Sequence, residues 1–213
     1  MTLLPARDYP WPEPLRTGVL TPRGLREGDP PAELAGRVPV AAVGSNASAR
    51  VLRHKLGDLL GTGLPIAGAV VEGLAVGHSA HISARGYVAA APFRGTGGAP
   101  RTVTVAWLDG AQLAAMDATE PNYTRVPLPA GMPCSRGGEP LTGVEVYRSA
   151  HGVLGDGGQA LDLQGQGAVL GWLADRLPGL AEELDHERLA TPGIPERVRV
   201  AIADAGLVVD AGL

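Results

Sequence analysis

Residues 38–60 constrain the fold more than any other stretch, because three patterns follow one another there without a gap. Residues 38–43 form a short apolar run, which is typical of a strand buried on both faces. The run breaks at Gly44-Ser45-Asn46. Residues 49–60 then place apolar side chains near a 3.6-residue period, at Val51, Leu52, Leu56, Leu59 and Leu60. We therefore predict a buried strand over 38–43, a tight turn, and a helix over 49–60.

The turn between this strand and this helix is a candidate anion site. Asn46 or Ser48 can cap the helix, and Gly61 is a plausible end for it. Backbone N–H groups converge at a helix N-terminus, where the helix dipole favours negative charge, and Gly44 has no Cβ to obstruct a ligand. The same residue types also occur in ordinary strand-to-helix turns, so the pattern alone leaves both interpretations open.

Composition limits the classes of function. With 213 residues, 45% hydrophobic and 19% charged, the chain suits one soluble domain with a sizeable core. A net charge of −4 and a single lysine, Lys55, argue against a nucleic-acid surface. No apolar run approaches the length of a membrane span, and the first residues lack the pattern of a signal peptide. Cys134 is alone, so we expect no internal disulfide and a cytoplasmic location.

The rest of the chain predicts a mixed α/β (α+β) fold in a single compact domain. Residues 1–37 are rich in Pro and Arg and indicate an extended arm, laid over the core by Trp11. We expect residues 38–150 to form the core and 151–213 a helical extension packed on it. Strands are expected in two stretches of 66–83 and at 86–92, 101–108, 123–128 (an edge strand) and 141–148, and helices at 166–177, 180–189 and 194–205.

Glu120 is the candidate acid or base. Asp109 and Gln112 have the spacing of a capping box and predict the start of a short helix there. That helix should end before Pro121, since the residue before proline is pushed out of the α region. Glu120 therefore lies where a helix ends and a strand begins, beside Tyr123, and such junctions often carry functional residues.

Two motifs resemble the γ-glutamylcyclotransferase-like family. Val43-Gly44-Ser45-Asn46 after a strand is similar to the family's Tyr-Gly-Ser-Asn loop, and Met116-Asp117 through Glu120 and Tyr123 to Arg125-Val126 is similar to its Leu-Asp-x-x-Glu-x-x-Tyr-x-Arg-Val stretch. The resemblance covers roughly residues 38–150. Val43 stands where the family usually has tyrosine, and Met116 where it has leucine.

The resemblance implies a small β-barrel-like mixed sheet with flanking helices and a cavity at its mouth. It implies that a γ-glutamyl amine or γ-glutamyl amino acid is cyclised to 5-oxoproline with release of the amine, without metal or cofactor. Glu120 would be the catalytic acid/base, and Val43, Gly44, Ser45, Asn46 and Tyr123 would bind the substrate, with Tyr87 as another candidate wall. The alternative is a non-catalytic small-molecule-binding or interaction module on the same fold.

Other chemistries have less support in the residues. His78 and His81 would lie on opposite faces of a strand, which suits one metal ion poorly, and His54 has no second ligand at the usual spacing. Ser45 with a histidine would suggest an acyl hydrolase, but Gly-x-Ser-x-Gly is absent. Cys134 lies in no thiol-enzyme motif. The sequence does not indicate an oligomeric state.

Overall fold

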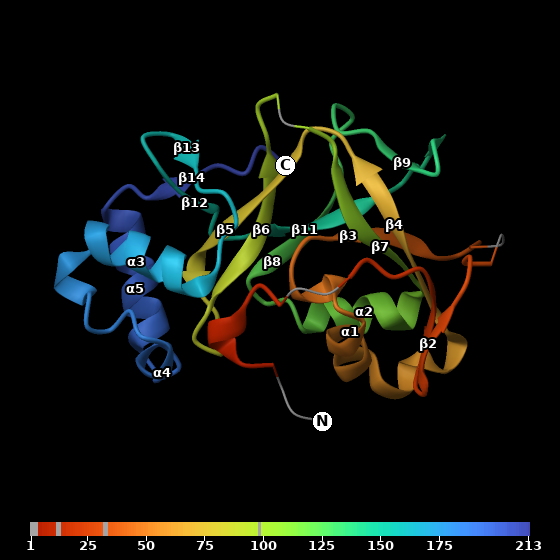
Figure 1. Cartoon of the computed structure of the whole chain (residues 1–213), viewed down its shortest axis with the longest axis horizontal. Helices are drawn as coiled ribbons and strands as arrows, with labels where there is room; N and C mark the ends of the chain where they lie inside the picture. The colour runs from red at the N-terminus through yellow and green to blue at the C-terminus, as the bar shows by residue number, and fades with distance from the viewer. Residues whose placement is uncertain (1–3, 12–13, 32–33, 98) are drawn as a thin grey trace. The chain divides into compact units, whose positions relative to one another are not determined.

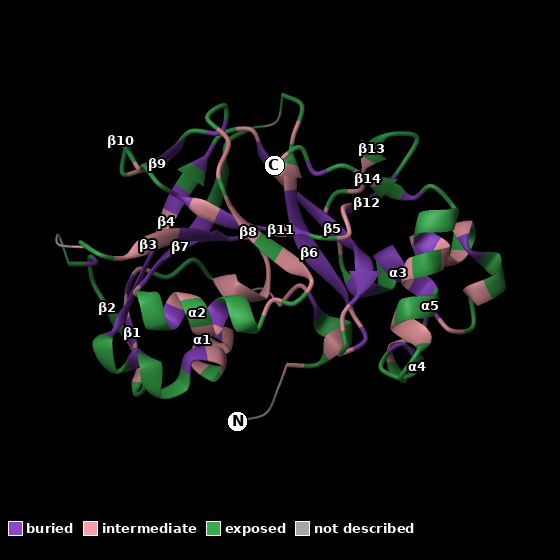
Figure 2. Ribbon diagram, turned by 180° about the vertical axis from the view of Figure 1, so that it is seen from behind, coloured by how far each residue is buried: buried purple, intermediate pink, exposed green. Residues whose placement is uncertain are grey.

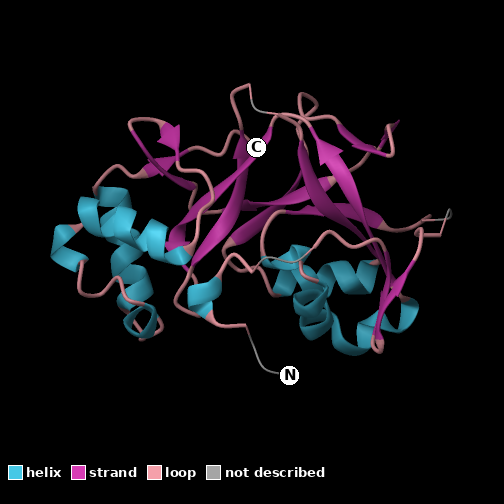
Figure 3. Cartoon of the chain, viewed as in Figure 1, coloured by secondary structure: helices cyan, strands magenta, loops and turns pink. Residues whose placement is uncertain are grey.

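The computed structural model describes residues 4–11, 14–31, 34–97 and 99–213. Contacts divide the described chain into two units built from interleaved stretches. The large-sheet unit comprises residues 14–75, 94–148 and 213, and the small-sheet unit comprises 4–11, 76–93 and 149–212. Figure 1 labels the elements, and Figure 3 shows that both units contain helices and strands. The fold is therefore mixed α/β, as the sequence predicts, and the structure shows two sheets.

The sheet of the large-sheet unit has nine strands among the described residues. Its main path runs β10-β9-β4-β7-β3-β11-β8, while β1 pairs with both β2 and β4. The strands are β1 (Gly18–Thr21), β2 (Gly24–Glu27), β3 (Val38–Ala42), β4 (Leu64–Val71), β7 (Arg101–Leu108), β8 (Tyr123–Pro127), β9 (Cys134–Arg136), β10 (Glu139–Pro140) and β11 (Glu145–Ser149).

The apolar run that opens the core lies inside this sheet, as predicted. β3 pairs antiparallel with β7, with Val40 opposite Ala106, and parallel with β11, with Val40 opposite Glu145. A strand with neighbours on both sides and covered faces has no solvated face, and this explains its continuous apolar pattern. β8 lies at the end of the strand order, as expected for a strand that contains Pro127.

Four helical segments accompany the large sheet. They are the 3₁₀ turn η2 (Ser45–Ala47), the helix α1 (Ala49–Leu56), the 3₁₀ segment η3 (Gly57–Thr62) and the helix α2 (Gly110–Ala118). Ser48 caps α1, since its side chain accepts a bond from the Val51 amide at 3.2 Å. The helix ends earlier than the predicted Leu60, because Gly57 adopts φ 50° and the chain continues as 3₁₀ helix.

The start of α2 confirms the predicted capping box. Asp109 accepts bonds from the amides of Ala111 and Gln112, and the Gln112 side chain in turn accepts a bond from the Asp109 amide. Gln112 is fully buried and also donates to the carbonyls of Leu59 and Gly63. The same side chain therefore begins α2 and ties it to the end of η3.

The core of the large-sheet unit consists of two clusters, one on each face of its sheet, and most of β3, β4 and β7 is buried (Figure 2). One cluster joins α1 and α2 to the sheet through Leu52, Leu56, Leu108, Met116 and Tyr147. A second cluster gathers residues such as Val105, Trp107, Val146 and Cys134. Because the helices are amphipathic and short, packing on the sheet supplies most of their stability.

The small-sheet unit has five strands among the described residues, in the order β13-β12-β5-β6 with β14 on β12. Its elements are η1 (Ala6–Asp8), β5 (Leu74–Ile82), β6 (Val88–Arg94), β12 (Val153–Asp156), β13 (Gln159–Ala160), α3 (Gln166–Arg176), η4 (Pro178–Leu180), α4 (His186–Leu189), α5 (Ile194–Asp204) and β14 (Val208–Val209). Its core packs residues of α3, α4 and α5 against residues of β5, β6 and β12.

Several expected elements differ from those observed. Residues 18–27, expected in an extended arm, form the β1–β2 hairpin. Residues 153–156, which lie in the stretch expected to be a helical extension, form the strand β12, and only the end of the helix expected at 180–189 forms, as α4. Trp11 packs edge-on against Tyr9 and Tyr87 of its own unit, at 5.0 and 5.5 Å between ring centroids. The division at residues 37/38 and 150/151 stays a prediction.

In the described ranges, no helix is long and apolar enough to cross a membrane.

Candidate functional site

The loop after β3 has the predicted order of strand, glycine and helix start. Gly44 precedes η2, and its carbonyl accepts the Ala47 amide at 2.9 Å. The Ser45 carbonyl accepts the Ser48 amide at 3.1 Å. These two bonds close the 3₁₀ turn and place the Asn46 side chain at its centre.

Glu120 lies at the junction between α2 and β8. Its amide donates to the Asp117 carbonyl at 3.1 Å, and its carbonyl accepts the Tyr123 amide at 3.0 Å. Both bonds hold the backbone of a short turn that begins one residue after the helix cap Thr119. The sequence prediction that Glu120 leaves a helix and enters a strand is therefore confirmed.

The structure brings Glu120 and the glycine loop together. Asn46 Nδ2 donates to Glu120 Oε1 at 2.9 Å, although the two residues are 74 positions apart. Lys55 Nζ contacts the same carboxylate oxygen and also donates to Asn46 Oδ1 at 2.8 Å. The three side chains thus form a closed ring of hydrogen bonds, which we call the Asn46–Lys55–Glu120 ring.

The ring is largely removed from water. The side chain of Lys55 is 16% exposed and that of Glu120 is 11% exposed. A buried ion pair contributes little net stability, since desolvation offsets most of the Coulomb attraction. Stability alone therefore does not explain why this pair is buried.

Lys55 is the residue that sequence reasoning missed. Lys55 lies on α1 and belongs to neither of the two motifs, so in the sequence it stands out only as the single lysine. The available signal was composition, because it is the one lysine among 18 basic residues. Lysine carries a compact ammonium on a flexible stem, whereas arginine carries a planar guanidinium, so the two side chains are not interchangeable in such a site.

A second charged cluster holds the turn that carries Glu120. Arg125 on β8 donates to both carboxylate oxygens of Asp117, at 2.9 and 3.0 Å, and also pairs with Glu145 on β11. Tyr147 donates to Asp117 Oδ1 at 2.7 Å. The Arg125 guanidinium keeps the pKa of Asp117 below its ordinary value, and burial raises the pKa of Tyr147. These contacts fasten the end of α2 to β8 and β11.

The other predicted site residues lie around the ring with different partners. Tyr123 is half-buried, packs with the cluster that contains Leu52 and Tyr147, and is joined to Glu120 through the backbone bond. Val43 is half-buried against the cluster of Val105 and Trp107.

Tyr87 belongs to the small-sheet unit and stacks on Tyr9 at 4.5 Å between ring centroids. Its ring therefore has a structural partner within its own unit, and its role as a wall of the site stays a prediction.

The histidines of β5 are buried in the small-sheet unit. His78 Nε2 accepts the Gln164 amide at 3.0 Å, whereas His81 Nδ1 lies 2.5 Å from the hydroxyl of Ser79. The His81 ring also packs against His151, at 4.9 Å between centroids. Burial lowers the pKa of both His78 and His81 to about 4. Within the described residues, no group of three or more His, Cys, Asp or Glu side chains is placed to hold a metal ion.

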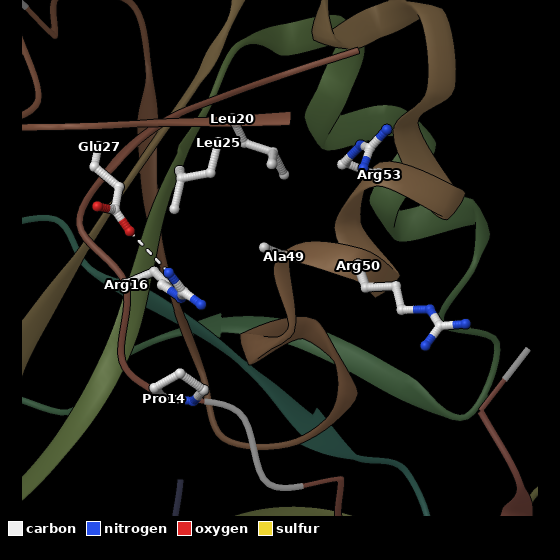
Figure 4. A pocket seen from close by; sticks show the side chains of 8 residues that line it. All are labelled: Pro14, Arg16, Leu20, Leu25, Glu27, Ala49, Arg50 and Arg53. Carbon is white, nitrogen blue, oxygen red and sulfur yellow. Dashed lines mark hydrogen bonds and ion pairs between the residues drawn. The ribbon is translucent and has the colours of Figure 1, made fainter. Parts of the chain in front are cut away.

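A pocket of about 620 Å³ lies elsewhere in the large-sheet unit, between the β1–β2 hairpin and the start of α1. It is lined by Pro14, Arg16, Leu20, Leu25, Glu27, Ala49, Arg50 and Arg53. In Figure 4, Arg16 and Glu27 pair on one side of it, while Arg50 and Arg53 rise from α1 on the other. Because no residue of the ring lines it, this pocket is separate from the concave site that we expected beside Glu120.

Comparison of the chain with protein-family models, with curated proteins and with solved structures found no match.

Proposed function

We propose that the chain is a γ-glutamylcyclotransferase-like enzyme that cyclises a γ-glutamyl amine or γ-glutamyl amino acid to 5-oxoproline. The finer fold that goes with this proposal is a small β-barrel-like sheet in which Glu120 acts at the mouth. The substrate would be a small molecule, and no cofactor is required by the chemistry.

The observation that carries the proposal is the bond between Asn46 and Glu120. The two residues come from the two separate stretches that resemble the family, and each stretch would be an ordinary turn by itself. Their side chains meet at 2.9 Å in a largely buried setting. A general base must lie within hydrogen-bond reach of the group that it deprotonates, and a glycine loop next to it offers donors for substrate oxygens.

The chemistry needs one proton acceptor. The α-ammonium of the substrate loses a proton to Glu120, and the neutral amine attacks the γ-carbonyl carbon. The attacking nitrogen then gives up a second proton as the bond from that carbon to the leaving nitrogen breaks. Glu120 relays both protons, one after the other, to the leaving amine, which departs as an ammonium, and the ring nitrogen keeps one hydrogen as the lactam N–H. An ordinary glutamate and an ordinary α-amine differ by about 3.5 pKa units, or about 5 kcal/mol, and desolvation narrows such a gap because it disfavours both charged forms.

The ring gives Glu120 the geometry of an acceptor. Oε1 receives both the Asn46 and the Lys55 contacts, so Oε2 is the oxygen that a substrate ammonium would meet first. The amides of Ser45 and Asn46 begin the 3₁₀ turn, a position where helical N–H groups lack intrahelical partners. They are the donors that we assign to the oxygen of the attacked carbonyl.

A binding module without turnover is the second candidate. Two observations favour it: Val43 stands in place of a cavity-lining tyrosine, and Lys55 already occupies one oxygen of Glu120. A module of this kind would bind γ-glutamyl compounds and leave them unchanged.

Incubation of the protein with a panel of γ-glutamyl amino acids and γ-glutamyl amines tests the proposal. We expect 5-oxoproline and the free amine to appear in equal amounts for at least one member of the panel. Binding without product would favour the module, and neither binding nor product would reject both candidates.

A further inference from the structure

Lys55 places a positive charge directly beside the proposed base. Its ammonium has three hydrogens, and within the described part of the chain the ring uses two of them, on Glu120 Oε1 and Asn46 Oδ1. The third remains for another acceptor. The site therefore offers one carboxylate and one ammonium side by side.

This charge pair restricts what can bind. A ligand that brings only an ammonium to Glu120 would place two cations at a single carboxylate, in a setting where few waters can screen them. A ligand that brings an ammonium and a carboxylate on the same carbon avoids this cost. The ligand's ammonium can pair with the carboxylate of Glu120, and the ligand's carboxylate can pair with the ammonium of Lys55. Every charge then has a partner of opposite sign.

We propose that Lys55 is a specificity-determining residue that binds the α-carboxylate of the substrate, so that the site selects an intact α-amino acid head group. The inference rests on the proposed function in one respect: it takes from it that the substrate's α-ammonium is the group that binds Glu120. It assigns the carboxylate to a side chain of α1, whereas the loop amides of Ser45 and Asn46 remain for the carbonyl under attack.

The position of Asn46 supports this assignment. Its amide spans the two charged groups, donating to Glu120 and accepting from Lys55, and so sets the distance between them. A compact ammonium can turn from one acceptor to another about a flexible stem, which a planar guanidinium does less readily. Turning the third ammonium hydrogen of Lys55 toward a bound carboxylate then requires only side-chain motion.

A measurement on the unaltered protein is possible because the chain has one lysine. Protein labelled with ¹³C-lysine gives one set of side-chain NMR signals, all from Lys55. The probes are L-glutamine and 4-aminobutanamide, which differ only in the α-carboxylate. We expect L-glutamine to shift the Lys55 ε-carbon signal in a saturable manner and to bind at least about tenfold more tightly than 4-aminobutanamide, as for loss of one charge-assisted hydrogen bond. Equal affinities, or no binding of either probe, would overturn the inference.

Variants test the same point from the protein side. In Lys55→Met, we expect the preference for L-glutamine over 4-aminobutanamide to fall to within about threefold, while Lys55→Arg retains part of it. Arg53→Met is the matched control, since it removes a positive charge from the same helix where the guanidinium bonds to the Pro22 carbonyl. If folded Lys55→Met prefers L-glutamine over 4-aminobutanamide as strongly as Arg53→Met does, the carboxylate binds elsewhere. If Lys55→Met does not fold, the NMR titration of the unaltered protein decides.

The outcomes separate this inference from the proposed function. Release of 5-oxoproline together with an unchanged Lys55 signal would leave the enzyme proposal standing and overturn the role of Lys55. A shifted Lys55 signal and a carboxylate preference without 5-oxoproline would support the role of Lys55 and favour the binding module.

Discussion

Asn46 and Glu120 lie in two short motifs that indicate a functional site only because the fold brings their side chains into contact. Each occupies a turn that could be explained by local structure alone: Asn46 by the 3₁₀ turn after β3, and Glu120 by the end of α2. The bond between them at 2.9 Å joins the two turns into one polar site. Lys55, which no motif predicts, completes that site.

At this scale, we expect Asn46→Ala to lower kcat by roughly tenfold or more with little change in fold. The substitution removes the side chain that bridges Glu120 and Lys55, and a base held less firmly spends less time in a productive position. Steady-state kinetics on a γ-glutamyl substrate checks this. Thr124→Ala, at an exposed position of β8, is the control, and an equal loss of kcat in both variants would argue against a specific role for Asn46.

Elements position these residues through two anchors at opposite ends of α2. Gln112 ties its start to η3, and Asp117 ties its end to Arg125 on β8. Because Glu120 follows only three residues after Asp117, the second anchor fixes where the carboxylate can lie.

Arg125→Met should therefore loosen the turn that carries Glu120. It leaves the Asp117 and Glu145 carboxylates without their shared cation. We expect a lower kcat and a loss of roughly 1–2 kcal/mol in the free energy of unfolding, a modest figure because the Asp117 side chain is 41% exposed. Urea denaturation measures the second quantity. The control is Arg136→Met, which removes an exposed ion pair with Asp29 and should change neither kcat nor the free energy of unfolding. A comparable loss of either quantity in this control would contradict the prediction.

Gln112→Ala should destabilise the fold by about 2–4 kcal/mol. The side chain is fully buried, and its loss removes a donor from the Leu59 and Gly63 carbonyls and an acceptor from the Asp109 amide. Urea denaturation again gives the value, with exposed Gln159→Ala as the reference. A loss below about 1 kcal/mol would mean that water replaces these bonds.

The features that could be predicted from the sequence are those set by residues close together in the chain. The strand 101–108 and the capping box at Asp109 rest on alternation and on short-range spacing, and both are observed as predicted. The β1–β2 hairpin and the strand β12 were missed because each of these strands has only four residues, too few to show a clear alternation. In addition, β1 and β12 pair with β4 and β5, which lie far away in sequence. The ring shows the same division: turns at Asn46 and Glu120 are local features, whereas the contact with Lys55 exists only once α1 packs beside α2.

On the scale of the whole molecule, the two units differ in how they hold titratable groups. The large-sheet unit pairs its buried charges, as in the ring and around Asp117. The small-sheet unit instead buries His78 and His81, which bond to the Gln164 amide and to the Ser79 hydroxyl. The ionisable groups near His81 are the basic side chains of His151 and Arg199.

This difference predicts that the small-sheet unit loses stability in mild acid. Both histidines have a folded pKa of about 4 against an ordinary value of 6.5, so the unfolded chain binds more protons between these values. Stability is then fully present above about pH 6.5 and falls as the pH falls toward 4, by up to roughly 3 kcal/mol per histidine. Urea denaturation at pH 7 and pH 5 measures the change. Imidazole NMR titrations that place both pKa values near 6.5 would contradict the prediction.

The proposed cyclisation depends on Glu120, in the large-sheet unit, acting as the base. The most direct test compares 5-oxoproline release by the unaltered protein and by Glu120→Gln, with Glu139→Gln as an exposed control, on the γ-glutamyl substrate that the panel selects. Gln keeps the shape of the side chain but cannot accept the proton, so we expect release to fall by at least about 100-fold in Glu120→Gln and to stay unchanged in the control. Release by Glu120→Gln within a few fold of the unaltered protein, with the fold intact by circular dichroism, would contradict the account.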